Sequence, residues 1–200
     1  MNIRFTKTIA ILFFLTINNF CIAQIMVPII IPEHGFLPGR KFPLYSITEK
    51  YDFNNERINV ILFDDRDSLK LKKIECSDVE ITNESEISSP QMIFKIREYI
   101  ESLFSQSKII IDSTSNKVLE IRLEAIDSRL IGIGSIKVHG LCQLKIKTDS
   151  FDKIYCTDIV DGDKNAPLKP TSFVTRKTAS RFMTSAAIRE TIEKILSDLK

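Results

Sequence analysis

The alternation of apolar and polar side chains in residues 118–160 limits the fold more than any other feature of this chain. Apolar side chains occupy every second position from 119 to 125, with charged side chains between them, and a similar period returns in residues 136–147 and 153–160. A period of two predicts strands that bury one face. Together with a short apolar strand at 108–112, these segments predict an antiparallel series with one face of the sheet in water.

Two other segments have the three-to-four-residue spacing of amphipathic helices. The first begins at Pro90, where Ser88 or Ser89 can accept the first free amide protons, and ends near residues 105–107. The second covers residues 175–199. With a buried strand at 58–63, the pattern predicts a single α+β domain over residues 58–200. Its fold class is a two-layer sandwich, an antiparallel or mixed sheet of four to six strands packed against two helices.

Residues 1–23 have the order of an export signal. A positive start with Arg4 and Lys7 precedes an apolar stretch at 8–17, and small residues follow at Cys21 and Ala23. The apolar stretch is about half of the ~20 residues that a membrane-spanning helix needs. We therefore predict cleavage after Ala23 and a periplasmic or secreted protein.

Cys21 opens an alternative, because acylated lipoproteins begin at a cysteine. Their signal has a small residue immediately before that cysteine and an apolar residue three positions before it. The corresponding positions here are Phe20 and Asn18, which fit poorly. Attachment to a membrane through a lipid on Cys21 is therefore the secondary expectation.

The charge balance of the exported chain excludes one class of partner. The chain has 28 basic and 26 acidic residues, and removing the signal leaves 26 of each. A neutral protein without a basic stripe is a poor binder of nucleic acid. The chain contains no Trp and only four Tyr, so the usual stacking platforms for bases and sugars are missing as well.

Residues 24–57 are predicted to form an extended arm. Pro28, Pro32, Pro38 and Pro43 recur every four to six residues, which prevents a helix and removes sheet donors. Apolar residues occur between the prolines, so we expect the arm either to pack on its own domain or to contact a partner.

A cluster of charges, Asp64, Asp65, Arg66 and Asp67, follows the buried strand at 58–63. Carboxylates at strand ends can hold a metal or act as acid and base, but adjacent residues of a strand point to opposite faces. The favoured interpretation is a structural ion pair among Asp64, Asp65 and Arg66.

Three weaker motifs are interpreted as structural. Residues 161–165 have oxygen-bearing side chains at alternate positions but lack the glycine and glutamate that complete a calcium loop, so a polar turn is predicted. His139 is predicted to be solvated among lysines, and no serine elbow accompanies it. Gly132 and Gly134 lack the third glycine and the helix of a phosphate loop.

The exported chain retains three cysteines, Cys76, Cys142 and Cys156. Cys142 and Cys156 are predicted to lie on the same apolar face of two strands joined by a hairpin. The alternatives are a disulfide between these two residues or two buried free thiols, and either would be structural.

The order of these elements resembles the YajG-type small lipoproteins of the bacterial envelope. The similarity covers residues 57–199 and rests on a strand ending in Asp-x-Arg and on a closing helix with the spacing Arg181-x4-Ala186-x2-Arg189-x2-Ile192-x2-Ile195-Leu196-x-Asp198-Leu199. The resemblance implies a small, exported, non-enzymatic protein and supplies no catalytic residues. Relatives of this type carry a lipidated cysteine, whereas Cys21 has a poor context for lipidation.

The sequence therefore predicts an exported, non-catalytic envelope protein that acts by binding or assembly and needs no cofactor. The expected partners are envelope proteins, contacted through the 24–57 arm or through an edge of the sheet. Two alternatives stay open. One is a small-ligand carrier with a pocket between helices and sheet, and the other is a metal-assisted hydrolase using Asp64, Asp65 and Asp67 together with His139.

Overall fold

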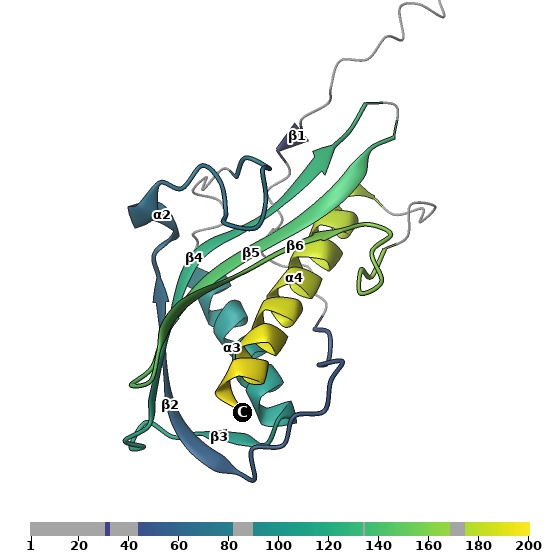
Figure 1. Cartoon of the computed structure of the whole chain (residues 1–200). Coiled ribbons are helices and arrows are strands. Elements are labelled where there is room, and N and C mark those ends of the chain that lie inside the picture. The colour runs from purple at the N-terminus through teal and green to yellow at the C-terminus, as the bar shows by residue number, and fades with distance from the viewer. Residues whose placement is uncertain (1–30, 33–43, 82–89, 134, 169–174) are drawn as a thin grey trace, which may run out of the picture.

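The computed structural model describes residues 31–32, 44–81, 90–133, 135–168 and 175–200, so the predicted signal and most of the arm lie outside the described residues (Figure 1). Six strands and three helices follow one another in the described part of the chain: β1 (Ile31–Pro32), β2 (Glu56–Asp64), α2 (Arg66–Leu69), α3 (Pro90–Gln106), β3 (Ile109–Ile111), β4 (Val118–Ile131), β5 (Lys137–Lys147), β6 (Asp152–Val160) and α4 (Arg176–Leu199).

The strands form one mixed sheet in the order β3-β2-β4-β5-β6, and β1 pairs with β4. β4, β5 and β6 are antiparallel neighbours, as predicted from the alternation. The expectation that the strand at 108–112 belongs to that antiparallel series was wrong, because β3 runs parallel to β2. A parallel pair needs a crossover connection, and α3 supplies it between β2 and β3.

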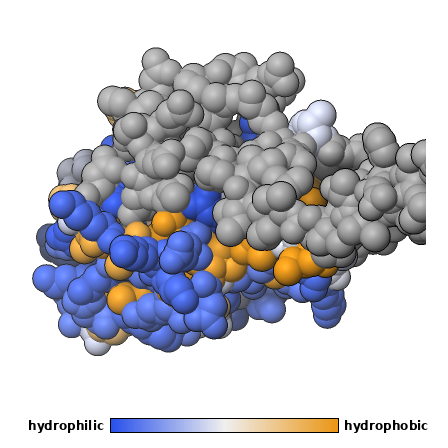
Figure 2. All heavy atoms as spheres, turned by 90° about the horizontal axis from the view of Figure 1, so that it is seen from above, coloured by the Kyte–Doolittle hydropathy of each residue, from blue (hydrophilic) through white to orange (hydrophobic). Residues whose placement is uncertain are grey.

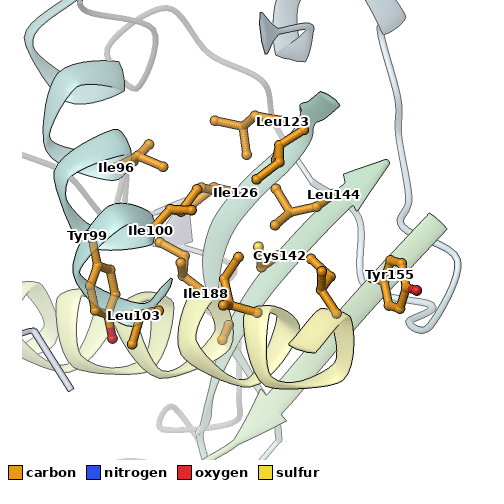
Figure 3. Close-up of a cluster of buried hydrophobic side chains, with 14 of the residues drawn as sticks. Ile96, Tyr99, Ile100, Leu103, Leu123, Ile126, Cys142, Leu144, Tyr155 and Ile188 are labelled. Atoms are coloured by element: carbon orange, nitrogen blue, oxygen red, sulfur yellow. The ribbon is translucent and has the colours of Figure 1, made fainter. Parts of the chain in front are cut away.

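Both long helices cover the same face of the sheet and bury its apolar side chains (Figures 1 and 3). Ile96, Tyr99 and Ile100 of α3 meet Leu123 of β4 and Ile188 of α4, and all five are at most 2% exposed. This arrangement confirms the predicted α+β fold, in which a sheet packs against two helices. Burial of this apolar face is the main force that holds the two layers together.

A β-bulge interrupts the alternation of β4 between Leu123 and Ala125. The extra residue moves Ala125 to the outer face of the sheet and Ile126 to the helix side, where it joins the main core. The expectation that Ala125 shares a face with Leu123 was therefore wrong. An irregularity of one residue reverses the faces of all positions that follow it.

α4 approaches the sheet closely at Gly140 of β5. A Cβ atom on this residue would lie 2.3 Å from the carbonyl oxygen of Met183 in α4. Only glycine leaves room for the helix backbone at this point. The start of α4 agrees with the sequence, because the Thr175 side chain accepts a hydrogen bond from the amide of Thr178.

Candidate functional site

The outer face of the sheet, opposite the helices, is only partly exposed to water. Residues 70–81, named the cover segment, cross this face and pack Ile74 and Ile81 against Ala125 and Leu141. The sequence predicted that this face of the sheet lies in water. That expectation was wrong for the covered half, since four apolar side chains spaced along a polar segment were enough to form a second, smaller core.

A disulfide between Cys76 and Cys156 fastens the cover segment to β6. Both alternatives for Cys142 and Cys156, a bridge between them or two buried free thiols on one face, were wrong because of the register of the hairpin. Cys142 pairs with Thr157 and Cys156 pairs with Gln143, so neighbouring positions separate the two cysteines onto opposite faces. Cys142 is fully buried in the main core, and burial raises the pKa of its thiol to about 12.

A second fastening joins the cover segment to the sheet through Asp158. Its carboxylate accepts a hydrogen bond from Ser77 Oγ and lies 2.9 Å from Nδ1 of His139. The side chain of His139 is only 15% exposed, so the prediction of a solvated histidine was wrong. In a hydrolytic triad the imidazole lies between serine and carboxylate. Here the carboxylate lies between serine and imidazole, so the order of the three groups differs from that of a triad.

A third link between the cover segment and the sheet is made by Arg129, which also belongs to a buried ion pair. Nη2 of Arg129 lies 2.7 Å from Oδ2 of Asp127, and both side chains are almost inaccessible to water. Nε of the same arginine donates to the carbonyl oxygen of Glu80 in the cover segment at 2.9 Å. Two buried charges that pair and also bond to backbone avoid the large penalty of an isolated buried charge.

The side chain of Gln143 also links the cover segment to the sheet. Its side-chain oxygen accepts from the amide of Glu75 at 2.8 Å, and its Nε2 donates to Glu124 at 2.8 Å. Serine, aspartate and glutamine at isolated positions carry no sequence signal for these contacts. The one sequence signal that the cover segment is attached to another part of the chain was Cys76, a cysteine within a charged segment.

The carboxylates that follow β2 are held by guanidinium groups. Arg66 is 2% exposed, and its Nε donates to Oδ1 of Asp64 at 2.7 Å. Oδ2 of Asp65 lies 3.1 Å from Nη1 of Arg122 on β4. These pairs neutralise two of the three aspartates named for a metal site, and nothing is described of the side chain of Asp67. Across the described residues, no group of three or more His, Cys, Asp or Glu is placed to hold a metal ion.

The turn at 161–165 closes the end of the β5–β6 pair. The side chain of Asp161 accepts from the amide of Val138 at 3.2 Å, and that of Asp163 accepts from the amide of Val160 at 2.8 Å. The oxygens that suggested a calcium loop are therefore used as acceptors for strand-end amides. This segment is a polar turn, as the sequence predicted.

On the helix side, the described end of the arm packs against the domain. Residues 44–53, named the strap, lie against α3 and α4 and contribute Tyr45 and Phe53 to the margin of the core. The amide of Tyr45 donates to the hydroxyl of Tyr99 at 3.0 Å. The hydroxyl of Thr48 donates to Glu193 of α4 at 2.9 Å. This part of the arm is bound to its own domain.

A shallow cleft of about 190 Å³ lies where the C-terminal end of α4 meets the β5–β6 turn. Lys117, Phe151 and Asp198 contribute to its walls. Pockets that enclose small molecules usually measure roughly 300–1,000 Å³. The cleft is smaller than the pocket expected of a ligand carrier, and it lies at an end of the two layers.

Comparison with known proteins gives no family and no curated relative for this chain. Solved structures similar to it include a Xanthomonas campestris protein of the DUF330 family, with a TM-score of 0.44 and 11% identity over 84% of this chain and 91% of that one. A minor lipoprotein from Acinetobacter baumannii has a TM-score of 0.38 and 7% identity, covering 72% of this chain and 90% of its own.

A further solved structure, an uncharacterized protein, has a TM-score of 0.38 and 12% identity, covering 79% of this chain and all of its own. The structural neighbours thus include a DUF330 protein and a lipoprotein, and at these values they carry no function over to this chain. Neither long helix in the described part of the chain combines the length and the apolar character needed to cross a bilayer.

Proposed function

We propose that the chain is an exported, non-catalytic protein of the bacterial envelope that acts by binding or assembly, and that the free edge of β6 is its contact surface. The observation that carries the proposal is the direction of the backbone groups of β6. This strand has a partner on one side only, since β5 is its sole neighbour in the described sheet.

The hydrogen-bond pattern determines which residues of β6 point away from β5. The pairs Thr148–Phe151 and Val138–Asp161 are hydrogen-bonded at the two ends of the hairpin. Hydrogen-bonded pairs alternate along an antiparallel ladder, so residues 153, 155, 157 and 159 bond to β5. The amides and carbonyls of Ile154, Cys156 and Asp158 consequently point outward, where an extended segment of another protein can add as a strand.

One lysine side chain occupies part of this edge. Nζ of Lys194 in α4 donates to the outward carbonyl of Cys156 at 2.8 Å and to the hydroxyl of Thr157 at 2.9 Å. Lysines at sheet edges oppose unwanted pairing between copies of a protein. The side chain is 44% exposed and flexible, so a partner strand can displace it. Lys194→Ala should therefore strengthen partner binding or self-association.

The non-catalytic part of the proposal is supported by how the reactive groups are engaged. The carboxylates of Asp64 and Asp65 are paired with arginines, and Ser77 donates to a carboxylate and not to His139. These contacts fasten α2 and the cover segment to the sheet. The chain would then act through the contact surface proposed above, the edge of β6, on a sheet that these contacts keep rigid.

Site-specific photocrosslinking in the protein's own cells tests the contact surface. A crosslinker at Asp152, on the β6 edge, should trap a partner, and one at Glu98, on the exposed face of α3, should not. Ile154→Pro should abolish the crosslink, because proline removes an outward amide without removing a bond to β5. Equal crosslinks at both positions, or an unaffected crosslink in the proline variant, would contradict the proposal.

Intact mass of the protein from its own cells tests the proposed location. A chain that begins at Gln24 in the periplasm or medium would support an exported protein without an anchor. A chain that begins at an acylated Cys21 would place it at a membrane. A chain that retains Met1 in the cytoplasm would contradict export.

A further inference from the structure

The disulfide between Cys76 and Cys156 lies at the surface of the domain, on the strand that has a free edge. Cys76 is exposed and Cys156 is partly buried, so a thiol of another molecule can reach the sulfur of Cys76. Cys156 is also one of the β6 residues whose backbone groups point away from β5. Exposed disulfides exchange with external thiols more readily than enclosed ones.

The disulfide holds the far end of a small hairpin. Lys73 and Glu80 form an antiparallel bridge, and the amide of Ile81 donates to the carbonyl oxygen of Lys72 at 2.7 Å. The cover segment is therefore a hairpin, in Figure 1 the blue loop that follows α2. Its tip, residues 74–79, reaches across β5 and is bonded to β6.

Two hydrogen bonds to side chains of the sheet add to the disulfide at this tip. Ser77 Oγ donates to Asp158, and the amide of Glu75 donates to Gln143 at 2.8 Å. Both bonds are only partly buried, so water can replace them when the tip moves away. The disulfide is the covalent link that keeps the tip closed.

The cover segment belongs to a core of its own. Ile74 and Ile81 pack with Ala125 and Leu141 on the outer face of the sheet. Among the described side chains, the larger cluster between the helices and the sheet contains no residue of the cover segment. Segments with few buried apolar contacts open locally without global unfolding. Release of the tip would thus uncover the outer face and leave the two-layer core folded.

The cover segment has one apolar and one polar side. Its apolar side keeps Leu141 of β5 from water. In Figure 2 hydrophilic residues surround smaller apolar patches on the described surface. The cover segment contributes five exposed charged side chains to this surface, those of Lys72, Lys73, Glu75, Asp78 and Glu80. Opening of the cover segment would replace this charged surface by an apolar strip beside the edge of β6.

We propose that the Cys76–Cys156 disulfide is a redox latch. A dithiol oxidoreductase with a Cys-x-x-Cys pair reduces it, and the cover segment is released from β6. Release clears the outer side of the β6 edge and uncovers Leu141 for contact with an added strand. This consequence for binding rests on the proposed function, whereas the opening of the latch does not.

Reduction proceeds by two thiol–disulfide exchanges. A thiolate of the oxidoreductase attacks Sγ of Cys76, the bond between Cys76 and Cys156 breaks, and Cys156 leaves as a thiolate that takes up a proton from water. The second thiolate of the oxidoreductase attacks the mixed disulfide and releases Cys76, which is protonated in turn. Two electrons pass to this chain, and the oxidoreductase is left with a disulfide.

Alkylation of the protein isolated from its own cells tests the latch. The oxidised protein is incubated in native buffer with a reduced thioredoxin-type protein, alkylated, digested and analysed by mass spectrometry. Cys76 and Cys156 should be modified only after reduction. Cys142 should stay unmodified in native buffer and react in urea, because it is fully buried in the main core.

Hydrogen exchange of the same samples measures the opening. After reduction the amide of Glu75 should exchange about tenfold faster or more, while the amides of α4 keep their protection. The double variant Cys76→Ser with Cys156→Ser should exchange fast without reductant. Ser77→Ala is the matched control, because it removes a hydrogen bond at the tip and keeps the disulfide, and it should stay closed until it is reduced.

Three outcomes would overturn the latch: no reduction in native buffer, reduction without faster exchange at Glu75, or alkylation of Cys142 in the reduced native protein. The last outcome would show that the disulfide holds the whole domain together.

Photocrosslinking at Asp152 tests the consequence for binding. The yield should rise in the double cysteine variant and stay unchanged in Ser77→Ala. An equal yield in wild type and the double variant would overturn control of the edge by the latch. Absence of any crosslink at Asp152 would contradict the β6 contact, whereas alkylation and exchange still decide the latch, so the two failures are distinguishable.

Discussion

Removing the hydroxyl of Tyr99 should weaken the attachment of the strap to the helices. Tyr99 is fully buried, and its hydroxyl accepts from the amide of Tyr45 at 3.0 Å. It lies 3.1 Å from the carbonyl oxygen of Tyr45 and 3.3 Å from that of Ser185, to either of which it can donate. Tyr99→Phe keeps the ring in the core and leaves these backbone groups without their partner.

The size of the effect follows from what stays buried. An unsatisfied buried donor or acceptor costs about 1–3 kcal/mol, and a typical hydrogen bond contributes about 1 kcal/mol. Tyr45 is half-buried, so water compensates only part of the loss at its amide and carbonyl, whereas the carbonyl of Ser185 lies within α4 and keeps its helical hydrogen bond. We expect a decrease of about 2 kcal/mol in the free energy of unfolding, which corresponds to about 6 °C in Tm for a domain of this size.

Urea unfolding followed by circular dichroism measures this difference, with Tyr51→Phe as the matched control. The hydroxyl of Tyr51 donates to Glu49 at 2.8 Å on the surface, so its removal should change stability little. Hydrogen exchange should show faster exchange of the Tyr45 amide in Tyr99→Phe alone. Equal stability of both variants and the wild type, with unchanged exchange at Tyr45, would refute the reasoning.

The same site gives a pH dependence. Burial raises the pKa of Tyr99 above its usual value of about 10. The folded state therefore favours the neutral phenol, and the contribution of this group to stability is complete below pH ~10 and is lost as the pH rises above it. The stability difference between wild type and Tyr99→Phe should shrink in that range.

Three further predictions concern bonds and contacts elsewhere in the domain. Cys76 and Cys156 are 80 residues apart in sequence, so Cys156→Ser should lower the free energy of unfolding by about 3–4 kcal/mol. Alkylation of the unfolded, unreduced exported chain should modify one thiol, that of Cys142; modification of a different cysteine would contradict the pairing. Hydrogen bonds from a neighbouring threonine, and then from an arginine, lower the pKa of Asp112 to about 2. The stability that it contributes is present above the unfolded pKa of ~3.9 and is lost as the pH falls toward 2. Asp112→Asn should flatten that part of the acid-unfolding curve, and superimposable curves would argue against the assignment. Gly140→Ala places a methyl group against the backbone of α4 and should cost about 3 kcal/mol by overpacking; a thermal melt that matches the wild type would show that α4 can move aside.

The sequence by itself determined the local elements. The start of α3 at Pro90, the extent of α4 and the antiparallel series of β4, β5 and β6 follow from spacing and, for α3, from its first residues. These features depend on the preferences of a few consecutive residues, which a sequence displays directly. The two-layer arrangement follows as well, because amphipathic elements bury each other's apolar faces.

Only the tertiary structure decided which segments meet. One residue of register separates Cys142 from Cys156, and one bulge moves Ala125 to the outer face, where it forms a core with the cover segment. Ser77 and His139 meet at Asp158 although 62 positions separate them, and no local pattern announces this contact. Contacts between distant segments depend on pairing register and on the packing of the whole domain, and these are properties of the folded chain.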